Sequence, residues 1–445
     1  MSFQDDYKAY CDTYGVPDRV ELMLVDMNGI IRGKWLDGAD AAKLDKGEAR
    51  LPLSTYAPSI FGHEVEASGI GGVIGDPDGI LMPIAGTLAP VPWLKGNIAQ
   101  VLVEMYEDVD TISVLSPREV LARVAKRFAA KGWHPVIASE LEFYLIEQRK
   151  DASDPPVAPP NLPQAQNYEL EIMERQAAVL EDIKDNAAAL GLPVDTVIAE
   201  YGPGQFEINF KHTDDILAAA DWAVIFRRMV RGTAAQHGWQ ATFAAKPFLE
   251  PPGNGMHLHA SVIDDDGNNI FDSADDIHPR LKNAIAGSIA TMEEAQALFA
   301  PHGNSYRRFQ PGSFAPTAPN WAEDHRGAGL RIPQSTGPAA RMEHRIAGAD
   351  INPYLAFAAI LQGMLDGLEQ DLTPPPAMVD PAEDATKGLT PIWENAMDVF
   401  EASSFCKSLL GDDLHRVFAA VKRDEIREMN TEIPPLEYAA YIGRI

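Results

Sequence analysis

The chain has 445 residues, enough for two or three domains at roughly 150 residues each. Its formal net charge is −28 at pH 7, and such an acidic surface repels phosphate backbones and anionic lipids, so we expect neither nucleic acid nor a membrane as a partner. No run of about 18 apolar residues could span a bilayer, the N-terminal residues lack the pattern of a signal peptide, and the two cysteines form no CxxC pair or disulfide framework. We therefore expect a cytoplasmic protein.

The first hundred residues are rich in strand signals. Apolar and β-branched residues predict strands over 20–25, 30–35 and 98–104, and a turn joins the first two at Asp26–Gly29. Residues 69–92 are rich in Gly, Pro and Asp, which favours loops. These features predict a small strand-rich domain over residues 1–108, followed by a larger unit over 109–445.

The rest of the chain mixes helices and strands. Ser116, Pro117 and Glu119 are typical of a helix start and predict a helix to about residue 131. Further helices are expected at 170–190, at 214–237 and from 353 onward; strands at 136–147, 206–210, 256–262 and 269–271, the last two around a turn; and a Pro-rich loop at 151–163. Because regular βαβ alternation is missing, the pattern predicts an α+β fold with antiparallel pairing and helices on one face.

Two glutamates stand out in the segment 136–147. Glu140 and Glu142 alternate with Leu141 and Phe143, so on a strand they share one face, about 6.6 Å apart. Two carboxylates on one face of an apolar strand repel each other and need cations between them or water around them. A metal site satisfies this requirement, and so does a solvent-exposed sheet edge.

Similar patterns recur further along the chain. Glu200 and Glu207 flank a glycine-containing turn that can bring them together, and His257 and His259 stand two residues apart. Glu343 lies between two arginines at the same spacing. Glutamate oxygens with an imidazole suit a hard octahedral cation such as Mg²⁺ or Mn²⁺. A histidine pair on a strand can equally be structural, so each pattern alone leaves the choice open.

Arginines gather in one stretch of the sequence. Residues 307–345 contain six of them: Arg307, Arg308, Arg326, Arg331, Arg341 and Arg345. Guanidinium groups bind carboxylate and phosphate through paired hydrogen bonds, and together with metal ions they indicate phosphoryl transfer. The chain has neither a Walker A motif nor GxGxxG, so a nucleotide site would be of another type. The alternative is that these arginines form surface ion pairs in an acidic protein.

Six ordered segments resemble the glutamine synthetase family. They are SELEFYLI (139–146), EYGPGQFEINF (200–210), GNGMHLHASV (253–262), NSYRRFQPGSFAP (304–316), RGAGLRIP (326–333) and RMEHRIAGADINPYLA (341–356). The segments 25–35 and 434–442 also resemble the family's N-terminal strands and its C-terminal ending. The resemblance implies a small N-terminal β-grasp domain followed by a large catalytic domain with a curved antiparallel sheet backed by helices.

The resemblance also implies roles for particular residues. The implied metal ligands are Glu142, Glu200 and Glu207 for one ion, and Glu140, His257 and Glu343 for a second. The implied ligands of glutamate are Gly253, Arg308 and Arg345, and those of ATP are Ser261, Arg331 and Arg341. The expected catalytic residues are Arg326, which would steady the γ-phosphoryl group, and Glu207.

Two departures from the family pattern concern the acceptor. Members that make glutamine carry a flap glutamate in a PGYEAP-like stretch, whereas this chain has Phe314 within residues 311–316, and Ser54 lies near the place of a second missing carboxylate. Those carboxylates would hold ammonium and accept its proton. Phe314 is therefore expected to form an apolar wall for an alkyl amine, unless it only packs within the flap.

The resemblance implies an ATP-dependent ligase that joins the γ-carboxylate of glutamate to an amine through γ-glutamyl phosphate. The departures make the chain similar to γ-glutamylpolyamine synthetases, which use putrescine or a related amine. A glutamine synthetase that uses ammonia and a catalytically silent regulatory paralogue remain as alternatives. Because the family forms stacked rings, we expect a dodecamer of two hexameric rings.

Overall fold

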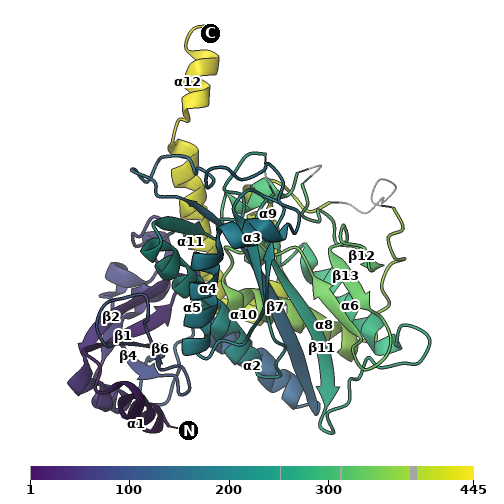
Figure 1. Ribbon diagram of the computed structural model, residues 1–445. Coiled ribbons are helices and arrows are strands. Elements are labelled where there is room, and N and C mark those ends of the chain that lie inside the picture. Colours follow the sequence, from purple (N-terminus) through teal and green to yellow (C-terminus); the bar gives the residue numbers. More distant parts are fainter. Residues whose placement is uncertain (1, 251, 311–312, 381–387) are drawn as a thin grey trace.

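The computed structural model describes residues 2–250, 252–310, 313–380 and 388–445. Two β-sheets and a set of helices make up this part of the chain (Figure 1). The strands of the smaller sheet lie between Arg19 and Tyr106, and the strands of the larger sheet begin at Trp133. The predicted α+β fold, with helices backing a mainly antiparallel sheet, is confirmed.

The smaller sheet has the strand order β2-β1-β6-β4-β3, with β5 paired to β6. Its strands are β1 (Arg19–Val25), β2 (Ile31–Asp37), β3 (Arg50–Pro52), β4 (Asp78–Pro83), β5 (Ala89–Pro90) and β6 (Ile98–Tyr106), and the helix α1 (Phe3–Tyr14) precedes them. The strands predicted at 20–25, 30–35 and 98–104 are confirmed. The expectation of loops over 69–92 is wrong for β4 and β5, whose β-ladder partner is the apolar strand β6.

The turn between β1 and β2 is built as the sequence predicts. Gly29 has φ +70°, a conformation that suits glycine. Asp26 closes the turn, because its Oδ1 accepts hydrogen bonds from the backbone N–H groups of Asn28 and Ile30. Arg227 Nη2 donates to the carbonyl of Gly29 from the larger part of the protein, so this turn is one of the places where the two parts meet.

The larger sheet has the order β12-β13-β14-β11-β7-β9-β8, with β10 paired to the end of β7. Its strands are β7 (Trp133–Glu147), β8 (Val194–Ala199), β9 (Gln205–Phe210), β10 (Trp239–Thr242), β11 (Met256–Asp264), β12 (Trp321–Glu323), β13 (Leu330–Gln334) and β14 (Arg341–His344). All pairs are antiparallel except β12 and β13. The long strand β7 lies at the centre and pairs with β11, β9 and β10.

Helices cover one face of this sheet. They are α2 (Pro117–Ala129), α5 (Ile216–Gln236), α6 (Pro279–Met292) and α8 (Pro353–Glu369), and α8 packs on the other three. Phe143 of β7 packs against Phe226 of α5 at 6.4 Å between ring centroids, and burial of each such aromatic side chain contributes roughly 1.5–3 kcal/mol. Ser116 caps α2 as predicted, since its hydroxyl accepts from the N–H of Glu119.

Two local expectations differ from the structure, and several elements, β8 among them, were not predicted. The helix expected at 170–190 is interrupted at Gln176, which separates α3 (Leu170–Arg175) from α4 (Ala177–Ala189). The strand expected at 269–271 is wrong, because only an isolated bridge between Ile263 and Asn269 forms there. The strand β8 was not predicted; its first residues are largely exposed, so its burial pattern is irregular.

The C-terminal region is helical, as expected. It contains α9 (Trp393–Ala402), α10 (Ser404–Leu410), α11 (Asp412–Thr431) and α12 (Pro435–Tyr441), and α7 (Gln296–Phe299) packs against α9. Buried Lys422 of α11 donates to Asn28 Oδ1 and to Glu425, which ties this helix to the β1–β2 turn. By contrast, α12 has no buried residue and projects away from the body (Figure 1). None of the described helices is long and apolar enough to cross a bilayer.

Candidate active site

A cavity of about 460 Å³, which we call the carboxylate cavity after the glutamates on its floor, opens on the face of the larger sheet opposite the helices. Most residues singled out from the sequence line it: Glu140, Glu142, Glu200, Glu207, Gly253, His257, Arg308, Phe314, Arg326, Arg331 and Arg345. Glu343 lies against its wall, and Ser261 and Arg341 do not line it. Segments more than 200 residues apart in sequence thus come together at one place.

Strands β7 and β9 supply the floor of the cavity. Glu140 and Glu142 share one face of β7, and Leu141 and Phe143 point to the opposite face, where both are fully buried. Glu207 of β9 stands directly opposite Glu142 in the antiparallel register, where Cβ atoms lie about 4.5–5.5 Å apart. The interpretation of 140–142 as a solvent-exposed sheet edge is wrong, because β7 is a central strand.

The turn between β8 and β9 brings Glu200 to the same cavity. Gly204 has φ +79°, and a Cβ atom there would lie 2.7 Å from the carbonyl oxygen of Leu145, so only glycine fits. The backbone N–H of Gly204 donates to Gln166, and Gln205 Nε2 donates to the carbonyl of Gly253. The turn is therefore fastened on both sides, and Glu200 lies close enough to Glu142 to raise the pKa of that carboxyl.

Strand β11 adds two histidines. His257 Nδ1 lies 3.0 Å from one oxygen of Glu140, and His259 Nε2 lies 2.9 Å from the other. Among the described residues, two trios at the cavity place one ligand atom each within 4.8 Å of one another: Glu140, Glu207 and His257; and Glu140, His259 and Glu343. The i, i+2 spacing signalled that His257 and His259 share a face, but His259 was not assigned to the site from the sequence.

Burial and mutual repulsion perturb the carboxyls. Burial, followed by the charge of Glu200, raises the pKa of Glu142 to about 8. Burial and the charges of Glu140, Glu142 and Glu200 raise the pKa of Glu207 to about 10. For Glu140, burial acts to raise the pKa, but hydrogen bonds with His257 and His259 hold it well below its usual range. A divalent cation would relieve this repulsion, so the carboxylates and imidazoles suit a metal ion such as Mg²⁺ or Mn²⁺.

Arginines face the carboxylates from the other side. Arg331 and Arg345 both donate to the fully buried carboxylate of Glu343, and Arg345 also donates to the backbone carbonyl of Arg326. Arg341 Nε lies 3.2 Å from His259 Nδ1. These contacts orient the guanidinium groups beside the acidic floor, where they can meet phosphate and carboxylate oxygens.

Arg308 has unused hydrogen-bonding capacity. Its Nη1 donates to the carbonyl of Ile346, while its buried Nε has no partner among the described residues. A buried donor left unpaired costs about 1–3 kcal/mol, so a ligand oxygen at this point would be stabilising. Gly253 lies against the side chain, since a Cβ atom there would meet Arg308 Cγ at 2.8 Å.

An aromatic pair stands at the mouth of the cavity. Phe314 is 66% exposed, and its ring centroid lies 4.9 Å from that of Tyr201, which is also exposed. Of the flap segment 311–316, Pro311 and Gly312 lie outside the described residues. Ser54 does not line the cavity of its own chain, and its hydroxyl donates to Asp76.

Several lining residues were not found from the sequence. Tyr168, Tyr201, Gln205, Asn209 and Lys246 also line the cavity. Tyr201 and Gln205 lie within the segment 200–210 that resembles the family. Their closeness in sequence to Glu200 and Glu207 could have indicated that they belong to the site. Tyr168 and Lys246 come from loops, where no periodic pattern marks a functional side chain.

Known proteins and a solved structure resemble this chain over nearly all of its length. A family model described as glutamine synthetase, catalytic domain, matches residues 114–441. The chain is 38% identical to the γ-glutamylputrescine synthetase PuuA of Escherichia coli strain K12, over 98% of this chain and 94% of that protein. It is 30% identical to the glutamate–isopropylamine ligase of a Pseudomonas species, over 96% and 95%. A solved structure described as a GmaS/ADP complex is 25% identical and matches with a TM-score of 0.85, over 98% and 99%. The chain belongs to the glutamine synthetase family.

Proposed function

We propose that this protein is an ATP-dependent ligase that joins the γ-carboxylate of glutamate to an alkyl amine, with putrescine as the favoured acceptor. The observation that carries the choice of acceptor is the exposed Phe314–Tyr201 pair at the mouth of the carboxylate cavity. Such a wall lacks the carboxylate that would hold ammonium and accept its proton, whereas it can contact the methylene groups of a longer amine. Similarity to proteins named as γ-glutamylputrescine synthetase and glutamate–isopropylamine ligase also supports an alkyl amine as the acceptor.

The acidic floor is the proposed site of two divalent cations, Mg²⁺ or Mn²⁺. When bound, such ions would neutralise charge on the phosphates of ATP and on the phosphoryl group in transfer. Proposed ligands are Glu142, Glu200 and Glu207 for one ion, and Glu140, His257 and Glu343 for the other. Because Glu207 lies near Glu140 and His257 as well as opposite Glu142, it stands between the two sets. We add His259 as a residue that orients Glu140.

The arginines are the proposed binding groups for the two anionic substrates. Arg308, Arg345 and the backbone at Gly253 would hold glutamate, and the unpaired Nε of Arg308 is a donor available for its carboxylate. Arg331, Arg341 and Ser261 would serve ATP, although Ser261 and Arg341 lie beyond the cavity lining. Arg326, an exposed side chain at the cavity, would stabilise the transferring phosphoryl group.

The proposed reaction has two steps. An oxygen of the glutamate γ-carboxylate attacks the γ-phosphorus of ATP, and ADP leaves, which produces γ-glutamyl phosphate. The amine nitrogen then attacks the acyl carbon, phosphate leaves, and the nitrogen loses a proton. Exclusion of water protects the acyl phosphate between the steps, and the Phe314–Tyr201 pair is placed to contribute to that exclusion.

Assembly, domains and location are also proposed. We propose a homo-oligomer, a dodecamer of stacked hexameric rings, supported by the exposed apolar residues on and beside the projecting helix α12: Leu436, Tyr438, Tyr441 and Ile442. A β-grasp domain over 1–108 and a catalytic domain over 109–445 are supported by the gap in regular structure between β6 and α2. A cytoplasmic location is supported by the two free cysteines, Cys11 and Cys406.

Phosphate release from ATP with glutamate and one amine at a time tests the proposal. The amines are ammonia, methylamine, ethanolamine, putrescine and spermidine, and putrescine or spermidine is expected to give the highest kcat/KM. Glu142→Ala should abolish release, and Glu147→Ala, at the exposed end of the same strand, should not. Highest activity with ammonia would indicate a glutamine synthetase, and no release with any amine would indicate a silent paralogue.

A further inference from the structure

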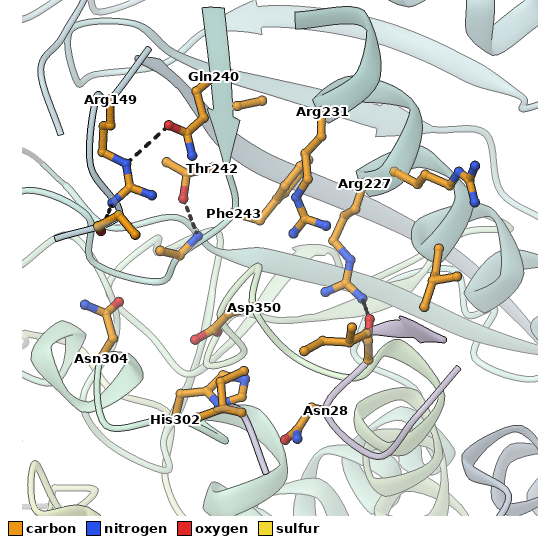
Figure 2. A pocket seen from close by; sticks show the side chains of 18 of the residues that line it. Asn28, Arg149, Arg227, Arg231, Gln240, Thr242, Phe243, His302, Asn304 and Asp350 are labelled. Atoms are coloured by element: carbon orange, nitrogen blue, oxygen red, sulfur yellow. Dashed lines mark hydrogen bonds between the residues drawn. The ribbon is translucent and has the colours of Figure 1, made fainter. Parts of the chain in front are cut away.

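A second cavity, of about 1140 Å³, shares no lining residue with the carboxylate cavity. The β1–β2 turn closes it on one side, and α5, β10 and the segment 302–304 form its other walls. Arg227 and Arg231 extend into it from α5, and Arg149 enters from the opposite side (Figure 2). The cavity therefore lies where the N-terminal sheet meets the larger part of the protein.

The charge of this lining is opposite to that of the protein. Five basic side chains line the cavity, namely Arg149, Lys150, Arg227, Arg228 and Arg231, with two acidic ones, Asp151 and Asp350. The whole chain carries 65 acidic and 37 basic residues. Of the five, only Arg228 forms an ion pair with a carboxylate, that of Glu21, among the described residues. Because the protein as a whole is acidic, this local excess of cations without carboxylate partners indicates a binding site for an anion from solution.

Arg231 is the clearest unpaired cation. Its guanidinium makes no hydrogen bond or ion pair within the part of the chain that the structure describes, and lies 5.4 Å from the ring centroid of Phe243. Arg227 stands one turn earlier on the same helix face, and like charges at this spacing repel. Burial, followed by the charge of Arg231, lowers the pKa of Arg227 to about 9. An anion between the two groups would remove this repulsion.

Arg227 and Arg149 donate hydrogen bonds only to neutral oxygens. Arg227 donates to the backbone carbonyls of Gly29, Ala349 and Ile351. Arg149 donates to the side-chain oxygen of Gln240 and to backbone carbonyls of the following loop (Figure 2). These contacts hold the guanidinium groups in place without neutralising them.

The two carboxylates of the lining each accept a hydrogen bond from a serine hydroxyl, and the buried Oδ1 of Asp350 has no partner among the described residues. Asp350 accepts a hydrogen bond from Ser305 at 2.6 Å, and Asp151 accepts from Ser153 at 2.6 Å. Asp350 lies near enough to Arg227 to interact with its charge, but no ion pair joins them among the described residues. The positive excess of the cavity therefore remains.

We propose that this cavity binds a small polyanion with two or more carboxylate or phosphate groups, held by Arg227 and Arg231 at one end and by Arg149 at the other. Guanidinium groups recognise both kinds of anion through paired hydrogen bonds. The cavity is far larger than one phosphate, and its aromatic walls, Trp239 and Phe243, suit an organic backbone. Asp350, at the wall of this cavity, lies four residues after Ile346, whose carbonyl accepts a hydrogen bond from Arg308. A short segment therefore connects the site to the arginine proposed to bind glutamate.

Binding of two probes to the full-length protein tests this inference. Succinate represents a carboxylate ligand and inorganic pyrophosphate a phosphate ligand, measured by titration calorimetry and by the fluorescence of the cavity residues Trp239 and Trp393. Saturable binding of at least one probe is expected, and the probe that binds identifies the anion class. Arg231→Gln should raise the Kd about tenfold or more, because a charge-assisted interaction is lost, and Arg231→Lys should raise it less.

Two variants serve as controls. Arg280→Gln removes another exposed guanidinium, one that lies 5.8 Å from the ring of Trp133 outside this cavity, and should leave the Kd unchanged. Arg326→Gln removes a cation from the carboxylate cavity and should also leave it unchanged. No saturable binding of either probe, or binding lost in Arg326→Gln but kept in Arg231→Gln, would overturn the inference. Neither readout depends on ligase activity, so this result is independent of the proposed function.

Discussion

Replacing Phe314 by glutamate should change the preferred acceptor. The side chain is 66% exposed and touches Tyr201 at the mouth of the cavity, so the exchange should leave folding intact. It removes the apolar wall and adds a carboxylate near the entry of the amine. Ammonia is expected to gain, because its cation acquires a partner, and alkyl amines are expected to lose their contact with the ring.

The size of the change follows from the contact area of the ring. A four-carbon amine that lays two methylene groups against the rings gains roughly 1.6 kcal/mol, at about 0.8 kcal/mol per methylene. That contribution corresponds to about 15-fold in kcat/KM. The new carboxylate can form an ion pair with ammonium, and at an exposed position such a pair contributes about 0–1 kcal/mol to its binding. The ratio of ammonia to n-butylamine activity should therefore rise by about 15- to 80-fold.

The assay is phosphate release with saturating ATP and glutamate at varied amine concentration. n-Butylamine is the main comparison because its tail is uncharged, and putrescine is measured beside it. Phe314→Gln, which removes the ring without adding charge, separates the two effects and should show only the loss of alkyl amine. Phe314→Leu should keep most of the original preference. An unchanged ratio in Phe314→Glu would refute the idea that this wall selects the acceptor.

Three more outcomes are expected. Folding raises the pKa of Glu142 from 4.5 to about 8, so the folded metal-free protein keeps a proton that the unfolded chain has lost, and its free energy of unfolding should fall from about pH 5 to pH 8. Over the same range metal affinity should rise, because protons compete less for the carboxylate. Calorimetry in two buffers counts the protons released on metal binding, and pH-independent metal binding would contradict this reasoning. Glu343→Ala leaves Arg345 buried without its carboxylate and should lower the free energy of unfolding, measured in urea, by about 3–5 kcal/mol. Glu323→Ala, at an exposed position, should lower it little. Similar losses in the two variants would argue against the buried ion pair. Removal of residues 432–445 takes away α12, which has no buried residue. The oligomer mass measured by light scattering should fall, while the helix packing of the subunit is kept. An unchanged mass would show that α12 is not a subunit contact.

Local sequence patterns were sufficient for much of the site. The alternation around Glu140 and Glu142 predicted both the strand and the shared face, because side-chain direction on a strand has a period of two residues. The glycines before Glu207 predicted the turn that brings Glu200 back toward the sheet. Likewise Ser116 predicted the start of α2, since a helix cap depends on only four consecutive residues.

Several expectations failed where pairing partners decided the outcome. The segment 269–271 has strand-forming residues, but only one bridge, from Asn269 to Ile263, joins it to β11. Strand β8 is half exposed and was not predicted, yet it pairs with β9 in a ladder whose register shifts once, between Val194 and Thr196. A strand depends on backbone hydrogen bonds to a neighbour, and the local pattern does not encode which neighbour is present.

The sequence by itself determined the chemistry of the site: the identity of its carboxylates, imidazoles and arginines, and the face of the strand on which each lies. Only the tertiary structure decided which of them meet. Glu140 is 119 residues from His259 and 113 residues separate Tyr201 from Phe314, yet both pairs are in contact. The same is true of the second cavity, which both Arg149 and Arg231 line. The physical reason is that short-range periodicity sets side-chain direction, whereas distance between remote segments depends on strand register and core packing.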